Sequence, residues 1–163
     1  IEWGAVAYLK QSNYGLGITD ITINSNSSYY TGGETGTSYK TNTGQSTSGN
    51  ITGVYDMSGG AIEYVMGNYN KTAGSSGLTV SGVPAEHIDI YSGTKVNYSH
   101  LGDAVGETAG WYSDSAGFVN SSNPWFSRGG YYGDGDNTGV FLFGNAGAAS
   151  SAYGFRTVLS ITE

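Results

Sequence analysis

The sequence predicts a small α+β domain with one or two short helices, a twisted antiparallel sheet and long loops. Its 163 residues include 28 glycines and only 12% charged residues, a composition of turns rather than of amphipathic helices. A helical pattern stands at the N-terminus, and period-two alternation of apolar residues is concentrated in the last third. A chain of this length makes one domain, over residues 1–163, with a core of its own.

The first helix is predicted over residues 1–12. Trp3 and Ala7 are four positions apart and therefore share one helical face. Gly15 then supplies the glycine that commonly follows a helix end. Further short helices are expected near residues 84–87 and 100–104.

The middle of the chain is predicted to consist mainly of loops. Residues 18–23 alternate apolar and polar and indicate one short strand. The rest of residues 17–52 has hardly a hydrophobic anchor, so this long connection either carries function or is held in place by its tyrosines. Residues 58–66 fit a buried turn followed by a strand.

The C-terminal third is predicted to form the antiparallel sheet. Apolar residues alternate at period two in residues 124–131, 139–144 and 153–161, and Gly, Asn and Asp separate these segments. We therefore expect three strands there.

Composition and charge exclude several classes of function. The net charge of −7, with only six Lys and Arg residues, leaves no basic stripe for nucleic acid. No apolar run is long enough to cross a bilayer, and we expect no direct membrane contact of this segment. The absence of cysteine excludes disulfides and thiolate chemistry. His87 and His100 fit no zinc spacing, and there is no Gly-x-Ser-x-Gly elbow, so we expect no enzyme. Fourteen tyrosines and low charge suit an extracellular binding protein.

Three charged residues stand among residues that should be buried: Glu63, Arg128 and Arg156. A buried charge persists only with a partner, so we expect Glu63 to pair with one of the arginines or with backbone groups. Their predicted role is structural, and no residue is predicted to be catalytic.

Residues 134–139 have oxygen donors at alternate positions, as the first half of a calcium loop does. Thr138 stands where Asp or Asn is usual, and Asn145 stands where an EF-hand has its final acid, so a hairpin turn is the preferred interpretation. We expect no cofactor, with a structural calcium ion kept as the alternative and no metal ligands named.

Several motifs resemble the formylglycine-generating (sulfatase-modifying factor) domain, a branch of the C-type lectin fold. They are Glu2-Trp3-Gly4-Ala5-Val6-Ala7, the segment 53–64 with Ser58-Gly59-Gly60, Arg128-Gly129-Gly130-Tyr131 and Gly154-Phe155-Arg156. The resemblance implies a C-type lectin-like fold, without the strand and helix that precede the first motif in the family. Enzymatic members use two cysteines, which this chain lacks, so a non-catalytic member is implied.

The last third is also similar in layout to C-type lectin-like variable proteins of diversity-generating retroelements and to lectin-fold domains of bacterial prepilin-like surface proteins. That resemblance implies a cell-surface adhesin or receptor with a protein or glycan ligand. The alternatives are a pilin-like or fibre subunit that forms a homo-oligomer or filament, and ordinary loop residues with no ligand. The implied ligand surface consists of Tyr131, Tyr132, Asp134, Asp136, Leu142, Asn145 and Tyr153, with Trp125 and Ser127 at its margin.

Overall fold

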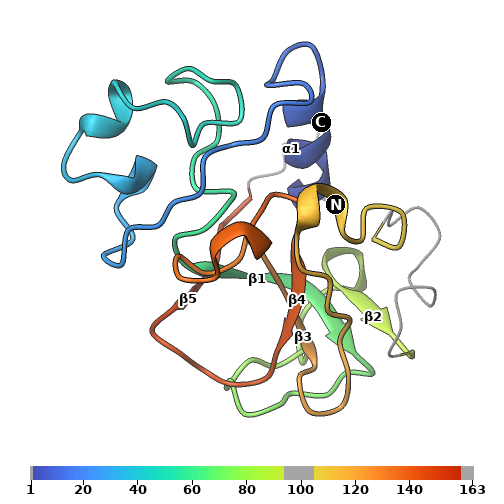
Figure 1. Cartoon of the computed structure of the whole chain (residues 1–163). Coiled ribbons are helices and arrows are strands. Elements are labelled where there is room, and N and C mark those ends of the chain that lie inside the picture. The colour runs from blue at the N-terminus through green and yellow to red at the C-terminus, as the bar shows by residue number, and fades with distance from the viewer. Residues whose placement is uncertain (1, 94–104, 159–163) are drawn as a thin grey trace.

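The structure is a computed structural model that describes residues 2–93 and 105–158. Within those ranges the protein is a small mixed α+β fold with one α-helix and an open five-stranded sheet. The predicted α+β class is therefore confirmed. Figure 1 shows the helix α1 at one end of the molecule, the sheet below it, and the loops between α1 and β1 as a lobe beside the helix.

Helix α1 spans Glu2–Gln11, which confirms the helix predicted over residues 1–12. Its inner face carries Ala7, which is buried, and Trp3, whose indole Nε1 donates a hydrogen bond to the carbonyl oxygen of Val140 at 2.7 Å. The helix ends where the carbonyl oxygen of Lys10 accepts hydrogen bonds from the turn that follows. Gly15 is required there, because a Cβ at this position would collide with that same carbonyl oxygen.

The sheet is built around strand β1, Ile62–Tyr69. Along one edge of β1 lies β3, Trp125–Arg128, which pairs antiparallel with β1 and with β4, Phe143–Ala146. Along the other edge lie β2, Asp89–Tyr91, and β5, Tyr153–Gly154, both parallel to β1. The sheet thus brings the C-terminal segment beside the first residues of β1.

Two predicted strands differ from the observed ones near the C-terminus. Strand β5 is parallel to β1, so the C-terminal sheet is not wholly antiparallel, and β5 covers only the first two residues of the predicted 153–161. Residues 159–161 lie outside the described residues. Residues 139–142 are buried but form a turn rather than a strand, closed by a hydrogen bond of 3.1 Å from the Leu142 N–H to the carbonyl oxygen of Gly139.

The other predicted elements give mixed outcomes. The strand expected at residues 18–23 is absent, since Ile18 is 90% exposed and only Ile21 of its apolar positions is buried. The short helix expected near residues 84–87 is present as a 3-10 helix, Ala85–His87. The helix expected at residues 100–104 lies outside the described residues.

The core has two parts, one under α1 and one on the sheet. In the sheet part the rings of Phe118 and Phe126 meet edge to face with centroids 5.0 Å apart, and Tyr91 packs against both at 5.3 and 5.2 Å. Such aromatic pairs bury large apolar areas in a chain with few aliphatic residues. The buried members are Ala7, Ile21, Met57, Val140 and Phe141 under α1, and Tyr91, Phe118, Val119, Phe126 and Phe143 on the sheet.

Polar side chains hold the long loop between α1 and β1. Asn24 is fully buried, and its Nδ2 donates to the carbonyl oxygen of Tyr30 at 3.0 Å and to Oδ1 of Asp56 at 2.9 Å. The same Asp56 oxygen accepts from the backbone N–H of Gly32 at 3.0 Å. The Asn24 carbonyl Oδ1 accepts from the backbone N–H of Asn26 at 3.0 Å. This network supplies the anchoring that the apolar content of the loop does not.

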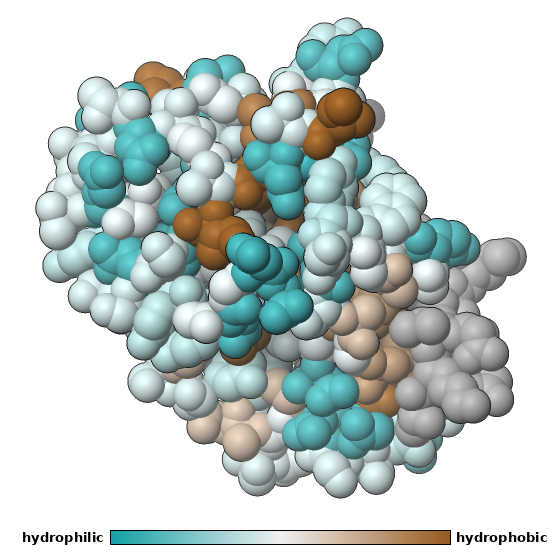
Figure 2. Space-filling view, viewed as in Figure 1, coloured by the Kyte–Doolittle hydropathy of each residue, from teal (hydrophilic) through white to brown (hydrophobic). Residues whose placement is uncertain are grey.

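The surface in the view of Figure 2 is mostly polar or neutral, with hydrophobic residues in small separate patches. Isolated exposed apolar residues of this kind are usual on a protein surface. Among the described residues, no helix has the length and hydropathy required to cross a membrane.

Candidate functional site

Three tyrosines from two distant segments come together beside the sheet. The rings of Tyr131 and Tyr132 have centroids 4.2 Å apart, and Tyr29 meets Tyr132 edge to face at 5.7 Å. All three residues are half-buried. The hydrogen bond to Tyr132 raises the pKa of Tyr131 to about 12, and burial and the neighbouring tyrosines act in the same direction.

Paired glycines fix the backbone that carries Tyr131 and Tyr132. Gly129 and Gly130 have φ values of 83° and 78°, in the left-handed region that favours glycine. The carbonyl oxygen of Gly129 accepts a hydrogen bond from Gly59 at 2.9 Å, and the N–H of Tyr132 donates to Gly60 at 3.0 Å. The Ser58-Gly59-Gly60 and Arg128-Gly129-Gly130 motifs therefore meet, and the tyrosines are placed at their junction.

Two carboxylates follow the tyrosines along the chain. Asp134 accepts a hydrogen bond from the backbone N–H of Tyr131 through Oδ2 at 3.0 Å, and Asp136 lies in the 3-10 helix Gly135–Asn137. Both side chains are exposed. We refer to Tyr29, Tyr131, Tyr132, Asp134 and Asp136 together as the tyrosine surface.

In the segment 134–139, residues Gly135–Asn137 form this 3-10 helix within the long connection between β3 and β4, where a tight hairpin turn was the preferred prediction. In the described part of the chain, no group of three His, Cys, Asp or Glu side chains is arranged to hold a metal ion.

Three residues of the implied ligand surface lie in the interior instead. Trp125, Ser127 and Leu142 have exposed fractions of 2, 4 and 6%. The indole of Trp125 donates to the carbonyl oxygen of Ala73 at 2.8 Å, because the loop after β1 covers this face of the sheet. These three side chains belong to the scaffold and are not available as surface contacts.

Asn145 and Tyr153 have other contacts. The amide of Asn145 donates to the carbonyl oxygen of Phe118 at 2.7 Å, so its side chain ties β4 to a neighbouring segment. Tyr153 stacks on Tyr64 with centroids 4.9 Å apart, and the Tyr64 hydroxyl donates to Ala148 at 2.7 Å. Burial raises the pKa of Tyr64. Tyr153 thus forms a second aromatic pair, half-exposed, at strand β5.

The ion pair expected of Glu63 is present, and its partner is Arg156. The Arg156 Nε lies 2.6 and 2.7 Å from the two carboxylate oxygens, and its NH2 group donates to the carbonyl oxygen of Asp56 at 3.1 Å. Burial raises the pKa of Glu63 in spite of the pairing. This contact joins β1, the C-terminal segment and the loop before β1, which is a structural role.

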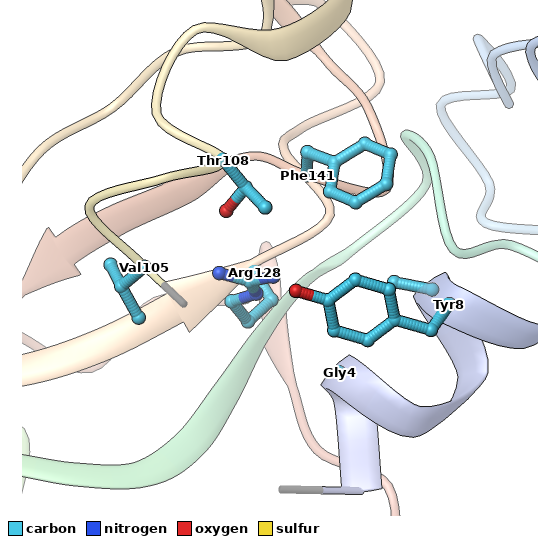
Figure 3. A pocket seen from close by; sticks show the side chains of 7 residues that line it. Gly4, Tyr8, Val105, Thr108, Arg128 and Phe141 are labelled. Atoms are coloured by element: carbon cyan, nitrogen blue, oxygen red, sulfur yellow. The ribbon is translucent and has the colours of Figure 1, made fainter. Parts of the chain in front are cut away.

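Arg128 lies at a small cavity of about 30 Å³ between α1 and β3, and Figure 3 shows it there with Tyr8. Its Nε is buried and has no hydrogen-bond partner among the described residues, and the guanidinium lies 5.5 Å from the centre of the Trp3 ring. Burial lowers the pKa of Arg128 to about 10, although the charge of Asp114 opposes this. The cavity has room for about one water molecule, too little for an organic ligand. We interpret Arg128 as part of the scaffold.

The sequence did not point to Tyr29 as a member of the site. It lies in the loop before β1, with a φ of 57°, and only the folded loop brings it to Tyr132. A tyrosine-rich loop without apolar anchors was the available signal, but nothing in it specified which tyrosine would meet the C-terminal third.

Comparisons of the chain with protein-family models, with curated proteins and with solved structures give no match.

Proposed function

We propose that this protein is a non-enzymatic, extracellular binding domain on a C-type lectin-like scaffold, and that the tyrosine surface contacts its ligand. The observation that carries the proposal is the meeting of three half-exposed rings beside two exposed carboxylates. Tyrosine offers large contact area and a hydroxyl at low entropic cost, which is why binding surfaces are rich in it.

The geometry favours a protein or glycan ligand that lies across a shallow surface. The rings of Tyr131 and Tyr132 pack against each other, and backbone hydrogen bonds between the two glycine turns fix the segment that carries them. Ligand binding therefore costs little side-chain and loop entropy. The ring faces suit apolar patches of a ligand, and the carboxylates accept hydrogen bonds from hydroxyl or amino groups.

The experiment is a screen of the purified chain against arrays of glycans and of surface proteins, followed by affinity measurement for the ligand found. We expect Tyr131→Ser and Asp136→Asn each to weaken that affinity about tenfold, or about 1.4 kcal/mol. The matched control is Tyr14→Ser, because Tyr14 is 87% exposed and lies in the turn after α1. Equal losses in all three variants, or none, would contradict the proposal.

A structural subunit that assembles with copies of itself is the second candidate. It is favoured by apolar side chains left open on and after α1, where Leu9 is 56% and Ile18 is 90% exposed. Light scattering across a range of protein concentrations tests it. If Ile18→Ser abolishes assembly and Tyr131→Ser leaves it unchanged, the result would favour self-assembly through the apolar side chains on and after α1.

A further inference from the structure

A hollow lies at the β2 edge of the sheet, and none of the residues that line it belongs to the tyrosine surface. It has a volume of about 290 Å³ and is bounded by the loop that links β1 to β2 and by β2 itself. An engineered cavity of about 150 Å³ in another protein is enough to bind benzene. The residues that line this pocket are Lys71, Val80, Ser81, Val83, Ala85, Ile88 and Ile90.

The wall of the pocket is mainly aliphatic. Val80, Val83, Ile88 and Ile90 are each partly exposed, although side chains of this kind are usually buried. An apolar ligand that filled the space would remove their remaining surface from water, at about 25 cal/mol per Å². The wall therefore suits a hydrocarbon body.

One charged residue, Lys71, is found among the described residues of the wall. It has a φ of 60° and follows Asn70, whose φ is 48°, so two adjacent non-glycine residues adopt the left-handed conformation. A hydrogen bond of 2.8 Å from the Asn70 N–H to the carbonyl oxygen of Tyr91 holds this turn against β2. The N–H of Thr72 donates to the carbonyl oxygen of Tyr69 at 2.8 Å, so these two residues are the centre of a tight turn, which accounts for their positive φ values.

The charge of Lys71 is unusual in its setting. The chain carries a net charge of −7 and has only six Lys and Arg residues. The ion pairs found within the described residues use Lys10 and Arg156, and none uses Lys71. The pocket thus combines an apolar wall with an ammonium group that is available for an anion.

We propose that this pocket binds a small aliphatic carboxylate, with the hydrocarbon chain against Val80, Val83 and Ile90 and the carboxylate on the ammonium group of Lys71. Charge-assisted hydrogen bonds to an ammonium are stronger than neutral ones, so the carboxylate fixes the orientation of the chain. This site is separate from the tyrosine surface, and its test does not depend on the proposed function.

The first experiment is calorimetric titration of the full chain with octanoate, octanol and acetate at pH 7. We expect octanoate to bind about tenfold more tightly than octanol, because only octanoate pairs with Lys71. Acetate should not bind measurably, since it has no chain to fill the pocket. No heat with octanoate, or equal affinities for octanoate and octanol, would overturn the proposal.

Matched variants test the two halves of the pocket. Lys71→Gln should weaken octanoate about tenfold and leave octanol unchanged, whereas Lys40→Gln, in the remote 3-10 helix Ser38–Lys40, should change neither. Val83→Asp should abolish binding of both ligands. Its control is Leu78→Asp, because Leu78 lies in the same loop, is 39% exposed and does not line the pocket.

Amide chemical shifts of the same samples locate the ligand and confirm that each variant is folded. Octanoate should perturb resonances of residues 80–90 and of Lys71. Perturbation centred on Tyr131 and Tyr132 would overturn the assignment of the pocket. A further outcome is that the wild type does not bind octanoate but forms a dimer, and that Val83→Asp abolishes this dimer. That result would show that a second copy of the chain covers the pocket, and it would also overturn the proposal.

Discussion

Arg156 binds Glu63 from a position 93 residues further along the chain, with its Nε within 2.6 and 2.7 Å of the two carboxylate oxygens. In the sheet, Glu63 lies directly opposite Arg128, yet its carboxylate is used by Arg156. The reason is β5, which pairs Gly154 with Glu63 and so delivers Arg156 to the carboxylate. The pair joins the C-terminal segment to the first residues of β1.

Removal of Arg156 should destabilise the protein. Arg156→Ala leaves Glu63 buried without its partner, and such losses cost about 3–5 kcal/mol when both groups are buried. Because the Arg156 side chain is 36% exposed, we expect a smaller loss of about 1–3 kcal/mol in the free energy of unfolding, measured with urea. The double variant Glu63→Gln with Arg156→Ala should recover part of the lost free energy of unfolding. A double variant no more stable than Arg156→Ala would contradict the ion-pair explanation.

The sequence was sufficient where a structure depends on neighbours along the chain. Trp3 and Ala7 predicted the helix because their spacing is a local property, and the glycines near Gly59 predicted a buried turn before β1 for the same reason. The need of Glu63 for a cation also follows from chemistry alone. Which arginine it takes depends on the parallel pairing of β5 with β1, which no local pattern encodes.

The ligand surface was only partly predictable for a related reason. Alternation along β3 shows that its side chains point to opposite faces, and it does not show whether a face is covered. Both faces are covered here, since Ala73 accepts the hydrogen bond of Trp125 and Phe126 lies in the core. Ser127 is therefore buried although its residue type suits a surface. Tyr29 joins the site from a loop whose path the sequence leaves undetermined.

Asn24 should be essential for the loop before β1. Asn24→Ala removes a fully buried amide and leaves the carbonyl oxygen of Tyr30 and Oδ1 of Asp56 without that donor. We expect a loss of about 2–3 kcal/mol in the free energy of unfolding. The control is Asn137→Ala, at an exposed position, which should change stability by less than about 0.5 kcal/mol. Equal effects would show that the loop is held by other contacts.

Asp114 should make stability depend on pH. Burial raises its pKa from 3.8 to about 6, so the folded protein holds this proton more tightly than the unfolded chain. The contribution of this group to stability is greatest below pH 3.8 and is lost as the pH rises through about 6. Asp114→Asn should therefore gain stability relative to the wild type between pH 4 and pH 8, in urea unfolding at each pH. The exposed Asp136→Asn serves as the control, and a pH-independent difference for Asp114→Asn would contradict the assignment.

Gly130 should tolerate a side chain poorly. A Cβ there would lie 2.8 Å from Cγ2 of Thr138 and 3.0 Å from Cδ1 of Leu142, at a φ of 78°. Gly36 has a similar φ of 66° with open space around it, so Gly36→Ala isolates the backbone strain, about 1 kcal/mol. Gly130→Ala adds the steric conflict with Thr138 and Leu142, so we expect a loss of about 2–4 kcal/mol in the free energy of unfolding, measured by thermal or urea unfolding. Equal losses of stability in the two variants would show that the neighbours of Gly130 move to accommodate a Cβ without a measurable energetic penalty.

The ring contact at the tyrosine surface should be visible in the titration of Tyr131. The hydrogen bond to Tyr132 favours the neutral phenol and raises the pKa of Tyr131 to about 12. Tyr132→Phe removes that bond, so the pKa of Tyr131 should fall toward the ordinary value of 10. Carbon-13 labelled tyrosine and NMR titration measure this change, with the resonance assigned by its loss in Tyr131→Phe. Tyr14→Phe is the control, and a Tyr131 pKa that is the same with and without the Tyr132 hydroxyl would show that the two side chains are not coupled in solution.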